Sequence, residues 1–313
     1  MELSVQTFLD SVSNPNTKKE YRYGIKKFSE WFGKTPGEIL KLRREDLTKK
    51  VKEDFVEQRF RAARFEREIE KFHSDLIKQG RSINTARTAT LGIRQLFRFY
   101  HMPIVLRSGS KVSKTVKTTK SFPLRIEHVQ EMFRVADLRE RVILSIATDL
   151  AFRISDFVRL KKTDLPSLEE ETPIPIQMMT KKEDVIAHAF LGAESVELLK
   201  TYLIHLEQKG EDRKGRAKRA GKKYRENPYL FPSNSASHIS EERVNALLKI
   251  LAEKAEINLN GKSFTFHCFR KMFLSAAIDA GIGLTAGKKL VGKSIPQSDD
   301  TYLTTIKLRD KFI

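Results

Sequence analysis

The sequence predicts a mainly α-helical protein with one small β-sheet (α+β), divided into two domains. Apolar residues recur at helical spacing through most of the chain. One pair of strand-like segments surrounds a charged turn near the middle. The length of 313 residues favours two domains, and a Ser/Thr/Lys-rich stretch after residue 105 separates two helical regions.

Residues 1–105 form the first predicted domain, and its predicted elements are all helices. An apolar stripe runs from Tyr21 to Phe32 at helical spacing, and Pro36 ends that pattern. A second, long helical pattern covers 52–80 and ends on a glycine, a common helix C-cap. A further helix is predicted over 83–100, with five core candidates: Ile83, Leu91, Ile93, Leu96 and Phe97.

The segment 106–120 is predicted to be a basic linker. It is rich in Ser and Thr, lacks acidic residues and has few large apolar ones, so it should not fold alone. Its regularly spaced lysines are candidates for contacts with a DNA backbone: Lys111, Lys114, Lys117 and Lys120. A plain solvated linker is the alternative interpretation.

Residues 121–313 form the second predicted domain. Helical patterns cover 125–136, 139–152 and 194–210, with a short helix and turn over 154–165. Two strands within 174–192 surround a turn at 181–184, and the basic stretch 211–228 is interpreted as a mobile loop. Four more helices are predicted toward the end of the chain, at 240–257, 267–281, 284–293 and 299–313.

The charge of the chain favours a polyanionic partner. Lys and Arg total 59 against 40 Asp and Glu, which gives a net charge of +19. Nucleic acid is favoured over an acidic membrane surface, because no strongly amphipathic basic helix is present. No apolar run is long enough for a membrane span, and the start lacks the order of a signal peptide. With one cysteine, Cys268, no intramolecular disulfide forms, and we expect a cytoplasmic, nucleoid-associated protein without a membrane partner.

Several polar residues of the second domain have ordinary explanations when each is taken alone. Arg153 could begin a helix and pair with Asp156, and Lys181 could be a solvated turn residue. Their order with later residues is more informative. His267 and Arg270 share one helical face, and Tyr302 follows Lys293 by nine residues.

This pattern resembles the tyrosine recombinase, or phage integrase, family. Four segments carry the resemblance, which covers most of 121–305: "ATDLAFRISDFVRLKKTDL", "TKKEDVIAHAFL", "TFHCFRKMF" and "KKLVGKSIPQSDDTY". It implies a helical core-binding domain and a catalytic domain that together clamp DNA, without a cofactor. It also implies four protomers acting on two double-stranded DNA sites through a Holliday junction, with accessory DNA-bending proteins as further candidate partners.

The resemblance assigns catalytic roles to Arg153, Lys181, His267, Arg270, Lys293 and Tyr302. Tyr302 would attack the phosphodiester and form a 3′-phosphotyrosyl link, which conserves the bond energy for rejoining without ATP. Two guanidinium groups would hold the oxygens of the phosphorane. His267 would accept the tyrosine proton or bind the phosphate. Lys181, or alternatively Lys182, would protonate the leaving 5′ oxygen. No carboxylate cluster for Mg²⁺ accompanies these residues, so metal-independent chemistry is predicted.

Two features depart from the family's pattern. Lys293 stands where a His or Trp usually follows the glycine, and only eleven residues follow Tyr302. The tail's apolar residues, Leu308, Phe312 and Ile313, would either dock on a neighbouring protomer or pack on the protomer to which they belong.

Three other functions remain as alternatives. One is a DNA-binding protein of the same fold with impaired catalysis, and the second is a relaxing activity like that of type IB topoisomerases. The third, RNA binding, is disfavoured because the aromatic signature of common RNA-binding domains is absent.

Overall fold

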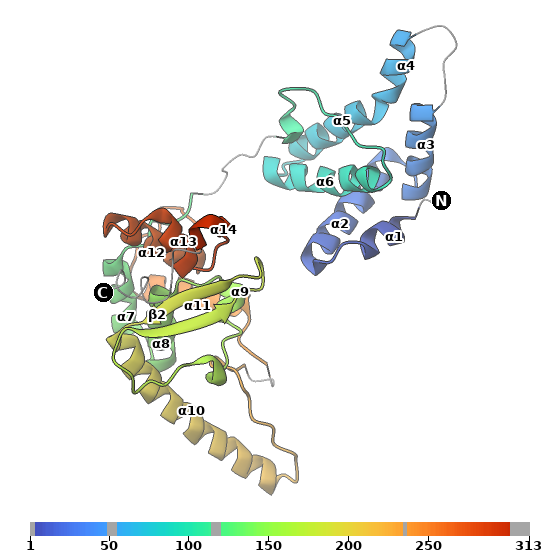
Figure 1. Ribbon diagram of the computed structural model, residues 1–313. Coiled ribbons are helices and arrows are strands. Elements are labelled where there is room, and N and C mark those ends of the chain that lie inside the picture. Colours follow the sequence, from blue (N-terminus) through green and yellow to red (C-terminus); the bar gives the residue numbers. More distant parts are fainter. Residues whose placement is uncertain (1–3, 49–54, 114–119, 234–236, 301–313) are drawn as a thin grey trace. The chain divides into compact units, whose positions relative to one another are not determined.

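The computed structural model describes residues 4–48, 55–113, 120–233 and 237–300 (Figure 1). They belong to two compact units, Met1–Thr118 and Thr119–Ile313. The described residues are mostly helical and include one two-stranded antiparallel sheet, which confirms the predicted fold class. The assignment of separate roles to the two units stays a prediction.

Unit 1 is built from helices around an aromatic-rich core. The core includes Phe28, Phe65, Phe72 and Phe97, all buried. Each comes from a helix with an apolar face, so burial of that face stabilises the unit. The helices are α1 (Val5–Asp10), α2 (Pro15–Phe32), α3 (Pro36–Thr48), α4 (Phe55–Ala62), α5 (Arg64–Lys78) and α6 (Ile83–Phe99), followed by a 3₁₀ helix at Lys111–Ser113.

Two predicted boundaries in unit 1 are wrong. Helix α2, which contains Tyr21, ends at Phe32 with Gly33 as its C-cap, and Pro36 opens α3 instead of only ending the pattern before it. Proline is well suited to a first helical turn because its missing N–H has no partner there anyway. The long pattern after Phe55 divides at Ala63 into α4 and α5.

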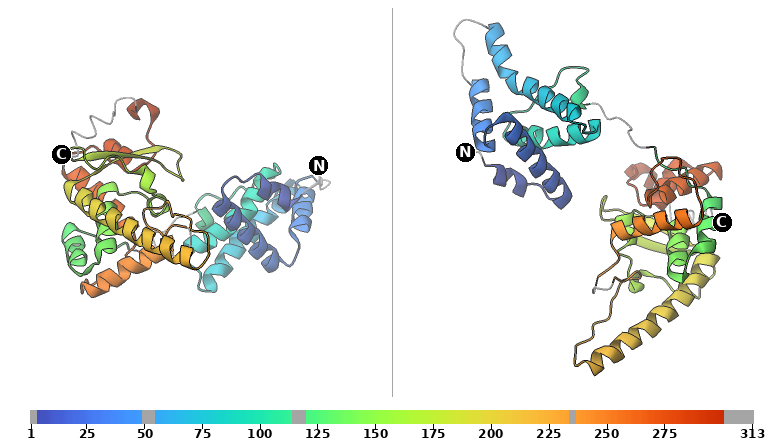
Figure 2. Two further views of the ribbon diagram at one scale, coloured as in Figure 1. Left: turned by 90° about the horizontal axis from the view of Figure 1, so that it is seen from below. Right: turned by 180° about the vertical axis from the view of Figure 1, so that it is seen from behind.

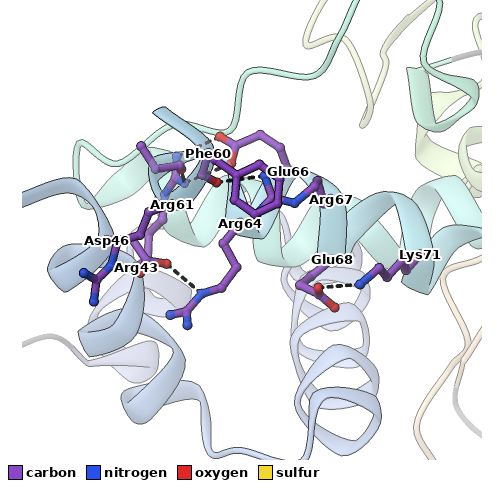
Figure 3. Close-up of polar contacts among 10 residues, drawn as sticks. Arg43, Asp46, Phe60, Arg61, Arg64, Glu66, Arg67, Glu68 and Lys71 are labelled. Carbon is purple, nitrogen blue, oxygen red and sulfur yellow. Dashed lines mark hydrogen bonds and ion pairs between the residues drawn. The ribbon is translucent and has the colours of Figure 1, made fainter. Parts of the chain in front are cut away.

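A polar network holds α3 against the junction between α4 and α5 (Figure 3). The buried Arg43 donates two hydrogen bonds to Glu66, at 3.0 and 2.9 Å, and another to the carbonyl of Ala62 at 2.6 Å. The buried Asp46 pairs with Arg64 at 2.8 Å. A paired guanidinium and carboxylate fix orientation as well as distance, so this network defines the angle at which the two helices meet α3.

Part of the predicted linker packs on unit 1. Val112 is 1% exposed and belongs to the core of that unit, and Leu106 packs against the same core. Arg107 pairs with Glu70 of α5 at 2.5 Å. The stretch 106–113 is therefore supported by the unit that precedes it, although it is not folded as a regular helix.

Unit 2 surrounds the largest apolar core of the described residues with helices and a β-hairpin. Its strands pair from Ile174 opposite Leu191 to Met179 opposite Ile186. The predicted hairpin is therefore confirmed. The elements are α7 (Ile126–Val135), α8 (Leu138–Leu150), α9 (Ile154–Phe157), a 3₁₀ helix at Lys162–Asp164, β1 (Ile174–Met179), β2 (Ile186–Leu191), α10 (Ala193–Arg219), α11 (Glu241–Lys254), α12 (His267–Asp279), α13 (Leu284–Leu290) and α14 (Gln297–Asp300).

Helix α10 continues to Arg219, through the first half of the basic stretch 211–228 for which the sequence predicts a loop. Its buried residues all lie in its first half, up to Tyr202, and its second half extends away from the rest of unit 2 (Figure 2). We call residues 207–225, the exposed end of this helix and the start of the returning segment, the basic arm. It contains nine Lys or Arg and three Asp or Glu.

No helix in the described parts of the chain is long and apolar enough to cross a membrane.

Candidate active site

Arg153 lies where α8 passes into α9. Helix α8 ends at Leu150, its buried C-cap residue Ala151 has a φ of 46° in the left-handed region, and Phe152 then enters the core. Arg153 is the N-cap residue of α9, and the ring of Phe157 packs on that of Phe266 with centroids 4.6 Å apart. This aromatic contact joins the Arg153 segment to the beginning of α12.

Helix α12 presents His267 and Arg270 differently. His267 is exposed, whereas Arg270 is 1% exposed and is among the largest buried side chains. Its Nη1 donates to the carbonyl of Ala151 at 3.3 Å and to that of Val291. Its Nη2 has no hydrogen-bond partner among the described residues. Burial, and then the charge of Arg153, lowers the pKa of Arg270 to about 10.

Gly292 joins these segments to the β-hairpin. Its carbonyl accepts a hydrogen bond from Nη1 of Arg153 at 2.8 Å, next to the Val291 carbonyl held by Arg270. Its φ is +65°, and a Cβ there would lie 2.6 Å from Cγ2 of Thr180 and 2.7 Å from Cβ of Ala187. Both the conformation and the lack of space therefore require glycine.

Replacing Gly292 by alanine is expected to destabilise unit 2 more than the same change at Gly261. Gly261 has a similar φ of +67° but open space around it. Gly261→Ala should cost about 1–2 kcal/mol from backbone strain alone, and Gly292→Ala a further ~1–3 kcal/mol from overpacking. Urea unfolding of the two variants measures the difference. Equal losses would show that the hairpin yields to the added methyl group.

The hairpin turn is connected through Asp156 to the site formed by Arg153 and Arg270. This carboxylate is 1% exposed, and its Oδ1 accepts from the backbone N–H of Lys181 at 3.0 Å and from Arg159 at 2.9 Å. Asp156 forms its ion pair with Arg159 and not with Arg153, the pairing that the sequence left open as an ordinary explanation of Arg153. The side chains of Lys181 and Lys182 are exposed, so both stay candidates for the general acid.

Glu183, in the same turn, is the site residue that the sequence reasoning missed. Its Oε1 forms an ion pair with Nη2 of Arg153, and its Oε2 accepts the backbone N–H of Ser294. The only sequence signal was an acidic residue next to the two turn lysines. Its contact with Arg153 joins residues 30 apart, so only the tertiary structure reveals it.

The site has an excess of positive charge. Although His267 is exposed as a residue, partial desolvation of its imidazole, and then neighbouring cations with Lys271 first among them, lower the pKa of His267 below its ordinary value of 6.5. Burial, and then Arg270 and Arg153, lowers the pKa of Lys293. A cluster of cations that depress one another's pKa values is suited to binding an anion.

We expect His267 to be mostly neutral at pH 7 and to titrate below 6.5. Because the charge of Lys271 contributes to this depression, Lys271→Gln should raise the pKa of His267 toward the ordinary value. NMR titration of the imidazole protons, assigned with His267→Gln, measures both values. An unchanged midpoint in Lys271→Gln would contradict the electrostatic explanation.

The structure brings together four of the six predicted catalytic residues. Arg153 and Arg270 contact adjacent carbonyls, and their charges act on His267 and Lys293. Lys181 is connected to this group only through its backbone N–H, which donates to Asp156. Tyr302 lies outside the described residues.

The structure describes two of the four linker lysines. Lys111 and Lys120 are exposed, and the Lys120 carbonyl accepts the Ser263 N–H at 2.9 Å. Lys114 and Lys117 fall outside the described ranges.

A metal site does not emerge from the part of the chain that the structure describes. There, no group of three or more His, Cys, Asp or Glu side chains is placed to hold an ion. The predicted metal independence stays a prediction.

Comparisons with known proteins give a family match and a set of similar folds. The model of the phage integrase family matches residues 124–305. A search of curated protein sequences finds no match. The XerH site-specific recombinase bound to palindromic difH substrate, in a post-cleavage complex, aligns with a TM-score of 0.63 and 17% identity. That alignment covers 92% of this chain and 76% of the XerH chain.

Two lambda integrase structures have similar folds. A dimer bound to a COC′ core site gives a TM-score of 0.57 at 14% identity, over 94% of this chain and 96% of the other. A tetramer bound to a Holliday junction also gives 0.57 at 14% identity, over 97% of this chain and 78% of the other. At such low identities these structures establish similarity of fold.

Proposed function

The chain belongs to the phage integrase family, and from this premise we propose that it cuts and rejoins DNA at specific sites through a covalent bond between Tyr302 and a 3′ phosphate. Family and fold support site-specific recombination in general. The proposal names the residues and the order of steps for this chain.

The observation that carries the proposal is the arrangement of two guanidinium groups around one turn. Arg153 and Arg270 donate to the adjacent carbonyls of Gly292 and Val291. Two planar cations held by a folded core are preorganised to receive the non-bridging oxygens of a phosphodiester. Tyr302 follows this turn by ten residues, which brings a nucleophile into the sequence neighbourhood of the clamp.

In the proposed reaction the Oη of Tyr302 forms a bond to phosphorus while the bond to the 5′ oxygen breaks. The tyrosine proton passes to His267, whose lowered pKa keeps its imidazole neutral and able to accept it. The leaving 5′ oxygen takes a proton from Lys181 or Lys182. The two arginines and Lys293 stabilise the charge that develops on the phosphorane, and the reverse sequence joins the new strand.

The test of this proposal begins with a pool of nicked duplexes of random sequence. Incubation with the full chain in EDTA should give covalent adducts on a denaturing gel, and sequencing the trapped DNA identifies the site. Two copies of that site should then exchange strands, and a synthetic Holliday junction containing them should be resolved. Adducts without exchange would favour the relaxing activity, and binding without adducts would favour a protein with impaired catalysis.

We propose duplex DNA as the partner and assembly of four protomers on two DNA sites. The net charge of +19 supports a polyanionic partner, and similar folds occur in DNA-bound dimers and a tetramer. The same strand-exchange assay, with accessory DNA-bending proteins added or omitted, tests whether such proteins take part. Association with DNA in the cell follows from this proposal.

The basic arm should contribute to DNA affinity without contributing to chemistry. Replacing Arg213, Lys214, Lys218 and Lys222, all exposed, by glutamine should weaken binding. The slope of log K against log salt should fall by about 0.9 for each phosphate that the arm no longer neutralises. Replacing Glu211 and Asp212 of the same arm by Gln and Asn is the matched control of opposite sign and should strengthen binding.

Circular dichroism checks that helix α10 persists in the arm variants, because basic residues in its last turn also interact favourably with the helix dipole. An unchanged salt slope with intact helix would place the arm outside the DNA interface.

A further inference from the structure

Glu183 holds two donors that a phosphate group would also use. One carboxylate oxygen contacts the guanidinium of Arg153, and the other accepts the backbone N–H of Ser294. The two donors come from segments 141 residues apart in the chain, so the carboxylate bridges them. Its side chain is only 25% exposed.

The surroundings favour an anion at this position. Besides Arg153, the cations Arg270 and Lys293 act on the same centre, and Nη2 of the buried Arg270 has no hydrogen-bond partner among the described residues. A guanidinium and a backbone N–H are typical donors to phosphate oxygens. One carboxylate satisfies only part of this donor set.

We propose that, in the absence of DNA, the Glu183 carboxylate occupies the position at which the scissile phosphate binds, and that it is displaced when this phosphate enters the site. This inference rests on the proposed function, because it takes Arg153 as a ligand of that phosphate. Displacement is favoured when DNA binds, because the many other phosphate contacts of the duplex bring one phosphate to the centre.

The hairpin turn is built so that Glu183 can leave while Lys181 stays. The backbone N–H of Lys181 is held by Oδ1 of the buried Asp156, whereas the Glu183 carboxylate is held by the side chain of Arg153 and the backbone N–H of Ser294. Asp184, the next residue, is exposed and has a φ of +53°. The first half of the turn is therefore anchored to the core through Asp156. The second half is held by the backbone N–H of Asp184, which donates to the Thr180 carbonyl at 3.1 Å, and the Glu183 side chain can leave without breaking either backbone contact.

Departure of Glu183 has a consequence for the nucleophile's segment. Ser294 precedes Tyr302 by eight residues, and its N–H is bound to Glu183 in the absence of DNA. Entry of the phosphate breaks this contact, and the Ser294 N–H then has a phosphate oxygen as its acceptor in place of the carboxylate. The site thus exchanges an internal anion for the substrate, and the contact of Ser294 passes from the hairpin turn to the DNA.

Inorganic sulfate is a suitable probe, because its binding requires neither a cognate DNA site nor a nucleophile. Sulfate is exchanged for chloride at constant ionic strength in the full-length, ¹⁵N-labelled protein. The Nε–Hε resonance of Arg153, assigned by its loss in Arg153→Lys, reports binding at the centre. If Glu183 occupies the place in about nine molecules of ten, its removal should tighten the apparent sulfate affinity about tenfold.

Three variants separate competition from other effects. E183Q keeps the size of the side chain and removes its charge, while E183D keeps the charge but is one methylene too short to bridge both donors. Both should bind sulfate about tenfold more tightly than the wild-type chain. D184N removes a charge from the exposed neighbouring position and should leave the affinity unchanged. Thermal unfolding confirms that each variant is folded.

Several results would overturn the inference. Sulfate affinity in E183Q and E183D that equals or falls below the wild-type value would make Glu183 a fixed structural partner of Arg153. An equal increase of sulfate affinity in D184N would show that only the net charge of the turn matters. If the Arg153 resonance responds to sulfate in none of the variants, sulfate does not bind at Arg153. If sulfate behaves as expected but no covalent DNA adduct forms, the competition stands and the recombinase proposal fails.

Discussion

Tyr302→Phe will abolish the covalent protein–DNA adduct and leave duplex binding within about twofold, since only one hydroxyl oxygen is removed and that oxygen is the proposed nucleophile. The phenylalanine ring keeps nearly the same volume as the tyrosine ring, so the substitution removes the hydroxyl group and little else. The measurement compares adduct on a denaturing gel and binding by filter retention, with the same nicked duplex and EDTA in both.

A matched control is Tyr229→Phe, which removes a hydroxyl from a half-buried tyrosine of unit 2 whose ring packs on His238. It should form adduct at the wild-type rate. Adduct formation by Tyr302→Phe at that rate would refute the nucleophile assignment. Loss of both adduct and binding in Tyr302→Phe would instead point to a structural role for residue 302.

Arg270→Lys will lower the rate of adduct formation by about 100-fold or more, in the range seen when one preorganised donor is removed. Lysine keeps the positive charge but loses the planar fork. Arg270 is held by the carbonyls of Ala151 and Val291, and its free Nη2 is the donor available to a phosphate oxygen. A lysine ammonium cannot satisfy both carbonyls and the phosphate with the same geometry.

The effect on rate must be distinguished from an effect on folding, because Arg270 is buried. Rates are therefore measured below the unfolding temperature of the variant and at saturating DNA. Arg134→Lys makes the same chemical change at an exposed position on α7 and should cleave normally. A wild-type rate in Arg270→Lys would show that charge suffices and that a guanidinium clamp is not needed.

The helical periodicities predicted the element types well, but boundaries set by tertiary contacts escaped them. The pattern across Ala63 is continuous in the sequence, and the break coincides with tertiary contacts that Arg43 and Asp46 of α3 make with residues on either side of it. Helix α10 was predicted too short because Gly215 and dense charge indicated a loop. Lys, Arg and Ala are good helix formers, and cations near the helix C-terminus are favourable, so the helix continues to Arg219.

In the candidate site, too, the sequence predicted which residues take part but not the contacts that tertiary structure determines. Arg153, His267 and Arg270 could be proposed from motif order, and the structure brings them into one electrostatic cluster. The partners of the acidic residues could not be proposed in this way. Asp156 pairs with Arg159, although Arg153 is equally near to it in the sequence, and the pairing of Glu183 with Arg153 depends on how the hairpin docks beside α9. Local sequence carries no information about that docking.

The two large cores of the chain draw on different stretches of sequence. One core uses residues between Phe8 and Val112, and the other uses residues between Phe122 and Phe269. A cut between them divides neither core, so the chain offers a natural point for domain exchange. Fusing the first 113 residues of another family member to residues 120–313 of this chain would make a hybrid in which both cores stay intact. Such hybrids would reveal which half selects the DNA sequence, and they would provide a route to redirecting it.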